Sequence, residues 1–157
     1  QHDQIRLRGI GSRRGSYEHT SFTFLGHTFR PRKSRNRKTG RNFTSFAPAI
    51  SRDALTAKSA EIRSWRIHRR TGSTLDDLAH TINPIVRGWM NYWGRFNRHE
   101  LYPLLRRINA YLMRWAQKKY KRLRGYRRVK AWWDAVVQRD RGLFAHWAWV
   151  RGAWMAG

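Results

Sequence analysis

Two adjacent carboxylates, Asp76 and Asp77, are the first candidates for chemistry in this sequence. A pair of aspartates is what a polymerase or nuclease needs to hold two metal ions. The pair lies within "STLDDLAH", shortly after Ser73 and Thr74, which suit the N-terminal cap of a helix. Acidic residues in the first turn of a helix offset its dipole by about 0.3–1 kcal/mol. We therefore interpret both aspartates as structural rather than catalytic.

The other residue types that support catalysis or metal binding lack a suitable arrangement. The seven histidines never form an HxxxH or HExxH pattern, and the sequence has no cysteine. Phosphate loops of the GxGxxG or GxxxxGK[ST] type are absent, and so is the GxSxG nucleophile motif. The sequence therefore predicts no catalytic residue, no metal site and no cofactor.

Charge is the dominant property of the chain. The 157 residues include 34 Lys and Arg against 9 Asp and Glu, which gives a formal net charge of +25. The excess positive charges repel one another unless a polyanion neutralises them. Of the basic residues 27 are arginines, whose guanidinium groups bind phosphate in a bidentate way and stack on bases. The composition indicates nucleic acid as the partner.

Two basic runs make this indication more specific. They are "RPRKSRNRKTGR" at residues 30–41 and "KKYKRLRGYRRVK" at residues 118–130. A charge run is usually a solvated face, but the second run is interleaved with Tyr120 and Tyr126. Alternating basic and aromatic residues are typical of surfaces that hold phosphates and stack bases. We therefore expect both runs to contact nucleic acid.

The elements that must position these residues begin with a β segment. Residues 1–20 show no sustained periodicity and are expected to form an irregular basic arm. Residues 21–50 predict a β-hairpin, in which "SFTFLGHTFRPR" is a strand with a bulge at Gly26 and "RNFTSFAPAI" is its partner. The intervening "PRKSRNRKTG" has the composition of a turn.

From residue 51 to residue 141 the signals are helical. Ser51 suits the N-cap of a helix that stops at residues 71–72. Ser73 or Thr74 then caps a short helix with helical apolar spacing from Leu75.

The segment "INPIVRGWMNYWGRF" at residues 82–96 predicts a separate helix. Asn83 is a favourable cap, and Pro84 is tolerated at the first helical position. The stripe expected to face the core consists of Ile85, Trp89, Trp93 and Phe96. The opposite, exposed stripe consists of Arg87, Asn91 and Arg95.

A long helix, capped by Asn97, is predicted to reach about Leu123. Its expected buried face consists of Leu101, Leu104, Leu105, Ile108, Leu112 and Trp115. Another face carries Arg107, Arg114, Lys118 and Lys121. Gly125 then breaks the chain before a last helix to about Arg139, and the apolar tail of residues 142–157 is expected to pack onto the rest. The sequence thus predicts a mainly α fold, a helical bundle with an N-terminal β-hairpin, α+β overall.

Length and hydropathy indicate the number of domains and the localisation of the protein. A chain of 157 residues suits one domain, and no apolar run approaches the roughly 20 residues of a membrane span. The polar N-terminus lacks the apolar region of a signal peptide. We expect a soluble cytoplasmic protein with no membrane partner.

Four segments in order carry a resemblance to a known family: "FTFLGHTFRPR", "INPIVRGWMNYW", "RWAQKKYKRLRG" and "GLFAHW". Together they resemble the C-terminal part of bacterial group II intron-encoded reverse transcriptases, also called intron maturases. The likeness runs from about Arg13 to His146. It implies that residues 24–26 match the junction between palm and thumb, and that the following helices form a thumb-like maturase domain that clamps primer and template and grips intron RNA.

The resemblance also implies which residues bind RNA, since it places Arg87, Asn91 and Arg95 on a helix typical of the maturase motif. With the two basic runs and the cationic helix face, the expected RNA-binding residues are Arg30, Arg32, Lys33, Arg35, Arg37, Lys38, Arg41, Arg87, Asn91, Arg95, Arg107, Arg114, Lys118, Lys121, Arg124, Arg127 and Arg128. They are expected to contact phosphates and the A-form shape of structured RNA.

The sequence departs from the family in two respects. The Tyr-x-Asp-Asp polymerase motif and the fingers and palm segments are absent, and so is the cysteine-containing nuclease domain of some members. RNA-directed DNA polymerase activity is therefore not expected of this chain alone, and Mg²⁺ is expected only if a palm domain complements it. Three interpretations stay open: an RNA-binding maturase module, a fragment that works with a separate fingers and palm chain, and a truncated or decayed remnant.

Overall fold

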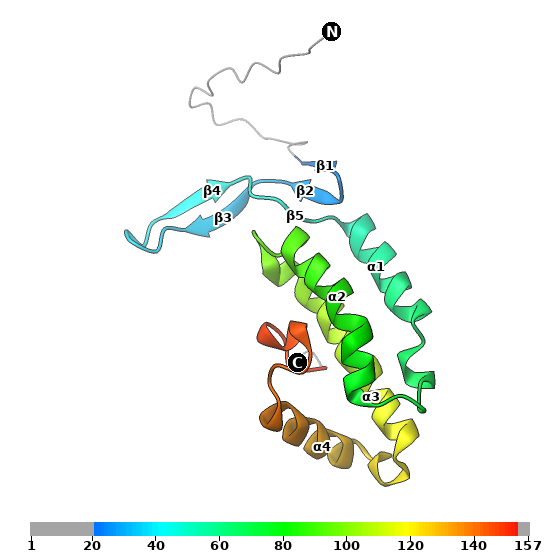
Figure 1. Cartoon of the computed structure of the whole chain (residues 1–157). Helices are drawn as coiled ribbons and strands as arrows, with labels where there is room; N and C mark the ends of the chain where they lie inside the picture. The colour runs from blue at the N-terminus through cyan, green and yellow to red at the C-terminus, as the bar shows by residue number, and fades with distance from the viewer. Residues whose placement is uncertain (1–20, 154–157) are drawn as a thin grey trace, which may run out of the picture.

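The computed structural model describes residues 21–153 of the chain (Figure 1). The predicted basic arm of residues 1–20 and the last four residues of the predicted tail lie outside this range. The fold is mainly α with a small N-terminal β region, as predicted. The strands are β1 (Phe22–Phe24), β2 (His27–Phe29), β3 (Arg32–Arg35), β4 (Asn42–Ser45) and β5 (Ala49–Ile50). The helices are α1 (Arg52–Ser64), α2 (Leu75–Trp93), α3 (Tyr102–Lys119) and α4 (Tyr126–Arg139).

Four 3₁₀ turns connect or follow the helices. They are η1 (Ile67–Arg69), η2 (Arg98–Leu101), η3 (Lys121–Leu123) and η4 (Ala145–Ala148). The strands gather near one end of α1, α2 and α3, whereas α4 lies near the other end (Figure 1). The chain that follows α4 returns toward α2 and α3, so η4 packs against α2.

The β region contains two hairpins instead of the single one predicted. Strands β1 and β2 pair across a two-residue turn at Leu25 and Gly26, both with positive φ (48° and 77°). This is the pattern of a type I′ turn, which matches the twist of a hairpin. The prediction of one continuous strand with a bulge at Gly26 is therefore wrong. Strand β5 pairs with the other edge of β2.

The second hairpin, residues 32–45, includes most of the basic run of residues 30–41. Strand β3 pairs with β4, so four of the ten residues predicted to be a turn, residues 31–40, form a strand. The turn itself spans residues 36–41, where the Asn36 side chain accepts hydrogen bonds from the backbone of Lys38 and Thr39 (2.9 and 3.2 Å). This hairpin projects away from the helices (Figure 1).

Helix α1 begins as predicted but ends earlier. The Ser51 hydroxyl accepts a hydrogen bond from the backbone of Ala54 (3.1 Å), which confirms the predicted cap. The helix stops at Ser64, and Arg66 adopts a left-handed conformation (φ 51°). This break lets Trp65 stack on Trp89 of α2 while Ile67 enters the core. The predicted continuation of the helix to residues 71–72 is wrong.

Helix α2 is a single helix through the position where the sequence predicted a restart. Its N-cap is Thr74, one of the two residues predicted for this position. Pro84 lies inside the helix, on its exposed side, and Asn83 is not a cap of α2. Instead, the buried Asn83 amide donates to the carbonyl of Leu143 and accepts from the backbone of Ala145 (both 2.9 Å). A tertiary partner 60 residues away therefore overrides the local capping signal.

The buried stripe of α2 is confirmed in its first part. Trp89 and Trp93 are buried, and Ile85 packs against the core. Phe96 is not part of this stripe, because the helix ends at Trp93 and the Phe96 side chain is 47% exposed. Gly94 ends the helix where a Cβ atom would overlap the ring of Trp149. The C-terminal segment thus closes over this end of α2.

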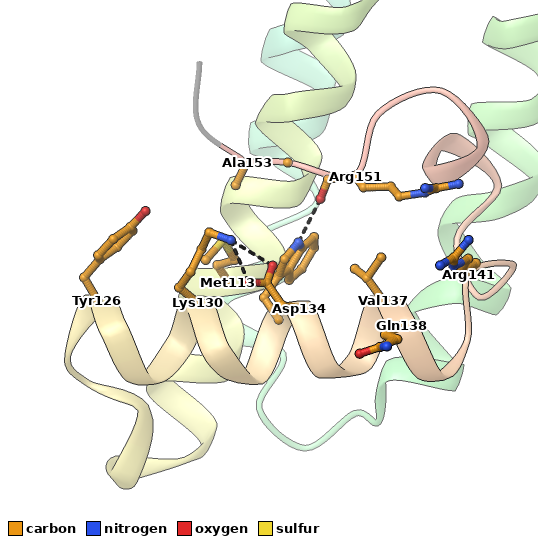
Figure 2. A pocket seen from close by; sticks show the side chains of 11 residues that line it. Met113, Tyr126, Lys130, Asp134, Val137, Gln138, Arg141, Arg151 and Ala153 are labelled. Atoms are coloured by element: carbon orange, nitrogen blue, oxygen red, sulfur yellow. Dashed lines mark hydrogen bonds and ion pairs between the residues drawn. The ribbon is translucent and has the colours of Figure 1, made fainter. Parts of the chain in front are cut away.

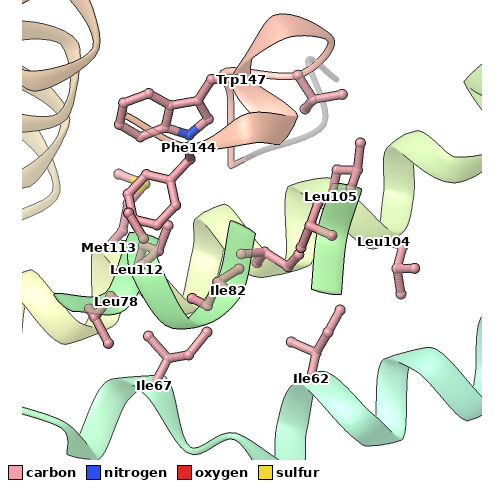
Figure 3. Packing of buried hydrophobic residues seen from close by; sticks show 14 of the residues in the cluster. Ile62, Ile67, Leu78, Ile82, Leu104, Leu105, Leu112, Met113, Phe144 and Trp147 are labelled. Carbon is pink, nitrogen blue, oxygen red and sulfur yellow. The ribbon is translucent and has the colours of Figure 1, made fainter. Parts of the chain in front are cut away.

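Helix α3 is the centre of the core. All six residues predicted for its buried face are buried, and they pack with Ile62, Ile67 and Ile82 from α1, η1 and α2 (Figure 3). The predicted cap is wrong: Asn97 has positive φ (47°), and its amide donates to the carbonyls of Ala47 and Pro48 (both 3.1 Å). The α-helix ends at Lys119 rather than near Leu123.

The C-terminal segment is tied to α3 by a buried polar cluster around Asn109. The Asn109 carbonyl accepts from the rings of His146 (2.5 Å) and Trp147 (3.0 Å). Its amide donates to the carbonyls of Val150 and Gly152 (3.3 and 3.1 Å). All four hydrogen-bonding positions of the amide are used, and Phe144 and Trp147 are fully buried beside it. This part of the apolar tail therefore packs onto the helices, as predicted.

None of the helices between residues 21 and 153 combines the length and the apolar character that a membrane crossing requires.

Candidate nucleic-acid interface

The adjacent aspartates both lie in the first turn of α2, as predicted. Asp77 and Thr74 form a reciprocal capping box at the start of α2, with hydrogen bonds of 2.9 and 3.1 Å. The backbone N–H of Thr74 that donates to the carboxylate lowers the pKa of Asp77. Within residues 21–153, no three His, Asp or Glu side chains gather as metal ligands would.

Exposed cations form a stripe along α3. Arg107, Arg114 and Lys118 are exposed, as predicted, because the opposite side of this helix is the buried apolar face. The fourth member of the predicted stripe, Lys121, lies beyond the helix in η3. The Arg114 guanidinium lies over the ring of Tyr111 (5.6 Å), which fixes its position on the surface.

A second set of cations, which the sequence analysis missed, lies beside this stripe. Arg63, Arg66 and Arg69 line a hollow of about 420 Å³ at the end of α1, together with His68. The prediction of one continuous helix through this segment did not include the break at Arg66, after which η1 packs on α3. The dense run "RSWRIHRR" was the signal available in the sequence.

His68 lies between the cations of η1 and those of α3. Its ring stacks on Tyr111 of α3 (5.5 Å), so η1 packs directly on α3. The pKa of His68 is lowered, first by burial and then by the positive charges of Lys118, Arg69, Arg114 and Arg66. The imidazole is therefore neutral at pH 7 and marks a region of positive potential. We call Arg63, Arg66, Arg69, Arg107, Arg114 and Lys118 the α3–η1 face.

The α3–η1 face continues along α3 into a second hollow. This hollow, of about 390 Å³, is lined by Arg106, Arg107, Tyr111 and Arg114, among others. Tyr111 and Arg114 therefore lie between the two hollows. Neither is lined by an aspartate or glutamate among the described residues.

The predicted residues of the basic hairpin divide into structural and exposed groups. The half-buried Arg32 donates to the carbonyls of Ala47 (2.8 Å) and Thr28 (3.4 Å), so its guanidinium holds the hairpin in place. Arg30 lies 3.6 Å from the Glu100 carboxylate, and Arg35 donates to the carbonyl of Gly40 (3.2 Å). The remaining predicted cations, all exposed, are Lys33, Arg37, Lys38 and Arg41.

The hairpin and the α3–η1 face are separate surfaces. The β region leads into the N-terminus of α1, and η1 follows its C-terminus. Thirteen residues of α-helix span about 20 Å. The structure thus does not bring the two groups of predicted cations together.

The other predicted residues lie on two further exposed surfaces. Arg87 and Asn91 share the exposed side of α2, whereas Arg95 lies past its end, over the ring of Phe96 (5.7 Å). The basic residues around η3 and the start of α4 are exposed: Lys121, Arg124, Arg127 and Arg128. Arg127 and Arg128 occupy the first turn of α4, which has no acidic residue, so the helix dipole disfavours them unless an anion is bound.

The turn between β1 and β2 is anchored to the helices. The Tyr92 hydroxyl donates to the carbonyl of Leu25 (2.7 Å), and the Trp93 indole donates to the carbonyl of Gly26 (3.1 Å). The backbone of Ser51 donates to the same Gly26 carbonyl (2.8 Å). The "FLG" segment is therefore held against the end of α2 and the start of α1.

The family of this chain is shown by a match that covers the helices that build the α3–η1 face. A family model described as "Group II intron, maturase-specific domain" matches residues 55–133, half of the 157-residue chain. The chain belongs to this family. No curated protein and no solved structure matches it. The resemblance to intron maturases is thereby confirmed.

All six residues of the α3–η1 face fall within the matched range of the maturase-specific domain. The β region precedes this range. The cationic surface is thus part of the segment that defines membership of the family.

Proposed function

We propose that this maturase-specific domain is an RNA-binding module that grips structured group II intron RNA, or an RNA/DNA duplex. The observation that carries the proposal is the gathering of six cations on the α3–η1 face, beside hollows that no aspartate or glutamate of residues 21–153 lines. None of these six cations forms a salt bridge within residues 21–153, and such positive charge favours a polyanion, because phosphate groups then supply the counter-charges.

The dimensions of the face agree with a duplex ligand. Arg107 and Lys118 are eleven residues apart on α3, which corresponds to about 16 Å along the helix. A nucleic-acid duplex carries one negative charge for about every 1.7 Å of its axis. Several phosphates therefore lie within reach of this stripe at once. In this function the module stabilises folded intron RNA for splicing and makes or breaks no bond itself.

A second candidate function is supported by the exposed apolar side chains of the first hairpin. Phe22, Phe24 and Leu25 are 61%, 63% and 69% exposed, and β1 is the edge strand of its sheet. An apolar edge strand suits pairing with a neighbouring sheet. The domain would then be one part of an RNA-directed DNA polymerase whose separate fingers and palm chain supplies the carboxylates that hold Mg²⁺.

Salt-dependent RNA binding tests the first function. Each neutralised phosphate contributes about 0.7–0.9 to the slope of log affinity against log salt concentration. Six contacts at the α3–η1 face predict a slope of roughly 4 to 5. The measurement is a titration of a folded group II intron RNA with the purified chain, from low to physiological salt. An affinity that does not change over this range contradicts the proposed function.

A further inference from the structure

A hollow of about 610 Å³ lies between α4 and the C-terminal segment (Figure 2). Most of its lining comes after residue 133, beyond the range that matches the family model. Its size is in the range of sites that bind small molecules. Ala153 lines both this hollow and the one along α3, so the two are neighbours.

The floor of the hollow is apolar and rigid. Trp133 and Met113 are buried there, and Val137 packs beside them. The Trp133 indole donates to the carbonyl of Arg151 (2.8 Å), and its ring meets that of Trp147 edge to face (5.3 Å). Because these contacts hold the indole in place, the floor does not have to rearrange when a flat ligand binds.

The rim carries polar groups of both signs. Lys130 donates to both oxygens of the Asp134 carboxylate (2.8 and 2.7 Å). Arg141 and Arg151 lie together toward one end of the hollow, and Tyr126 lies at the other end (Figure 2). Three cations against one carboxylate make the hollow favourable for an anion.

We propose that this hollow binds one unpaired nucleotide of an RNA. The base lies on the floor of Trp133, Met113 and Val137, and Tyr126 offers a ring on which its edge or a neighbouring base can stack. Arg141 and Arg151 bind the phosphate. The combination of an apolar floor, one carboxylate and paired arginines fits a flat base that carries a phosphate better than a phosphate alone.

Asp134 gives the site a base preference. Lys130 takes one acceptor position on each Asp134 oxygen, and each oxygen keeps another, so the carboxylate can still accept from a base edge with two adjacent donors. Guanine presents such an edge through N1–H and the N2 amino group. Uracil has no amino group, and carbonyls flank its single N–H donor. The hollow is therefore expected to bind guanosine 5′-monophosphate (GMP) about tenfold more tightly than uridine 5′-monophosphate (UMP).

The test is a titration of the whole chain with GMP, UMP and inorganic phosphate, observed by NMR at the indole N–H of Trp133. The expected result is a saturable shift of this signal with GMP, a weaker response with UMP and none with phosphate. Equal responses to all three would overturn the proposal, since they indicate only the general attraction of anions to a basic protein.

Asp134→Asn separates recognition of the base from charge. If only charge mattered, removal of the carboxylate would strengthen binding of GMP. Recognition of the base predicts the opposite, an affinity for GMP about tenfold lower with the preference over UMP lost. Arg141→Gln should weaken both nucleotides, and Arg139→Gln, an exposed change on α4 outside the hollow, should weaken neither.

Two further outcomes are informative. If GMP shifts Trp133 only after removal of residues 154–157, the chain's own C-terminus is the occupant and the proposal is wrong. The inference goes beyond the proposed function, because no residue of the α3–η1 face lines this hollow. A failure of nucleotide binding with salt-dependent RNA binding intact would therefore overturn the inference alone.

Discussion

Trp115→Ala is expected to destabilise the domain by about 3–5 kcal/mol, the typical effect of removing a buried tryptophan side chain. Trp115 is 1% exposed and lies edge to face with Tyr120 (6.2 Å). Its indole also donates to the carbonyl of Arg70 (2.7 Å), which fixes the chain after η1 against α3. Since domains are stable by only about 5–15 kcal/mol, we expect partial or complete unfolding at room temperature.

The control for this variant is Phe96→Ala. Phe96 is an aromatic residue of the same region of sequence but is 47% exposed and contacts Arg95 through its ring. Its removal should change stability by less than about 1 kcal/mol. Chemical denaturation followed by circular dichroism measures both. Equal stability of the two variants would show that Trp115 does not organise the packing of η1 on α3.

The second large effect is a loss of stability in mild acid that depends on His146. Burial lowers the pKa of His146 to about 3, from an ordinary value of 6.5. The Nε2–H group donates to Asn109, and Nδ1 is buried without a hydrogen-bond partner within the described residues. Protonation would place a charge and an unpaired N–H group in the core.

The direction of the pH dependence follows from this shift. Between pH 3 and 6.5 the unfolded chain binds a proton that the folded chain does not. The stability due to neutral His146 is therefore complete above pH 6.5 and is lost progressively as the pH falls toward 3. The full shift corresponds to about 4–5 kcal/mol as an upper limit.

His146→Gln tests this dependence, because a glutamine amide can still donate to Asn109 but does not titrate. Stability of the variant, measured by denaturation from pH 7 to 4, should fall much less over this range than that of the unmodified chain. Carboxylates such as Asp77, whose pKa is lowered, are present in both proteins, so the difference between the two curves reports on His146 alone. Parallel curves for the two proteins would show that His146 contributes no pH dependence.

Local signals in the sequence predicted the starts of α1 and α2 and the buried side of α3 correctly. Ser51 and Thr74 cap through their own backbone neighbours, so a few adjacent residues contain the information. The apolar spacing of α3 likewise reports directly on burial.

The wrong predictions concern residues whose partners are distant in sequence. Asn83 and Asn97 look like helix caps, but their amides bind the backbone about 60 and 50 residues away. Pro84 remains inside α2 because it lies on the exposed side, where water can bind the carbonyl that it leaves without a donor. The roles of these three residues depend on tertiary contacts and on burial, which the local sequence pattern does not reveal.

The candidate interface was predictable only in part for the same reason. The stripe on α3 follows from helical spacing alone. Arg66 and Arg69 join it because α1 breaks at Arg66 and η1 then packs on Tyr111. Arg32, predicted to bind RNA, donates instead to the carbonyl of Ala47, which lies 15 residues away. Net charge predicted nucleic acid as the partner. The packing of η1 on α3 defines which cations form the α3–η1 face.

The central claim, that the α3–η1 face is the main contact to RNA, is tested most directly by a double variant, Arg69→Gln with Arg114→Gln. Both residues are exposed, so each change should alter stability by no more than about 0.5 kcal/mol. The matched control is Arg52→Gln with Arg139→Gln, which removes the same charge from exposed positions outside both hollows of the face.

The measurement is the salt dependence of binding to a folded group II intron RNA for the unmodified chain and the two double variants. The account predicts that Arg69→Gln with Arg114→Gln lowers the log–log slope by about 1.4–1.8 and weakens affinity at least tenfold, at about 1 kcal/mol per contact. The control should change both quantities little. Equal losses in the two double variants would mean that net charge, and not this face, binds the RNA.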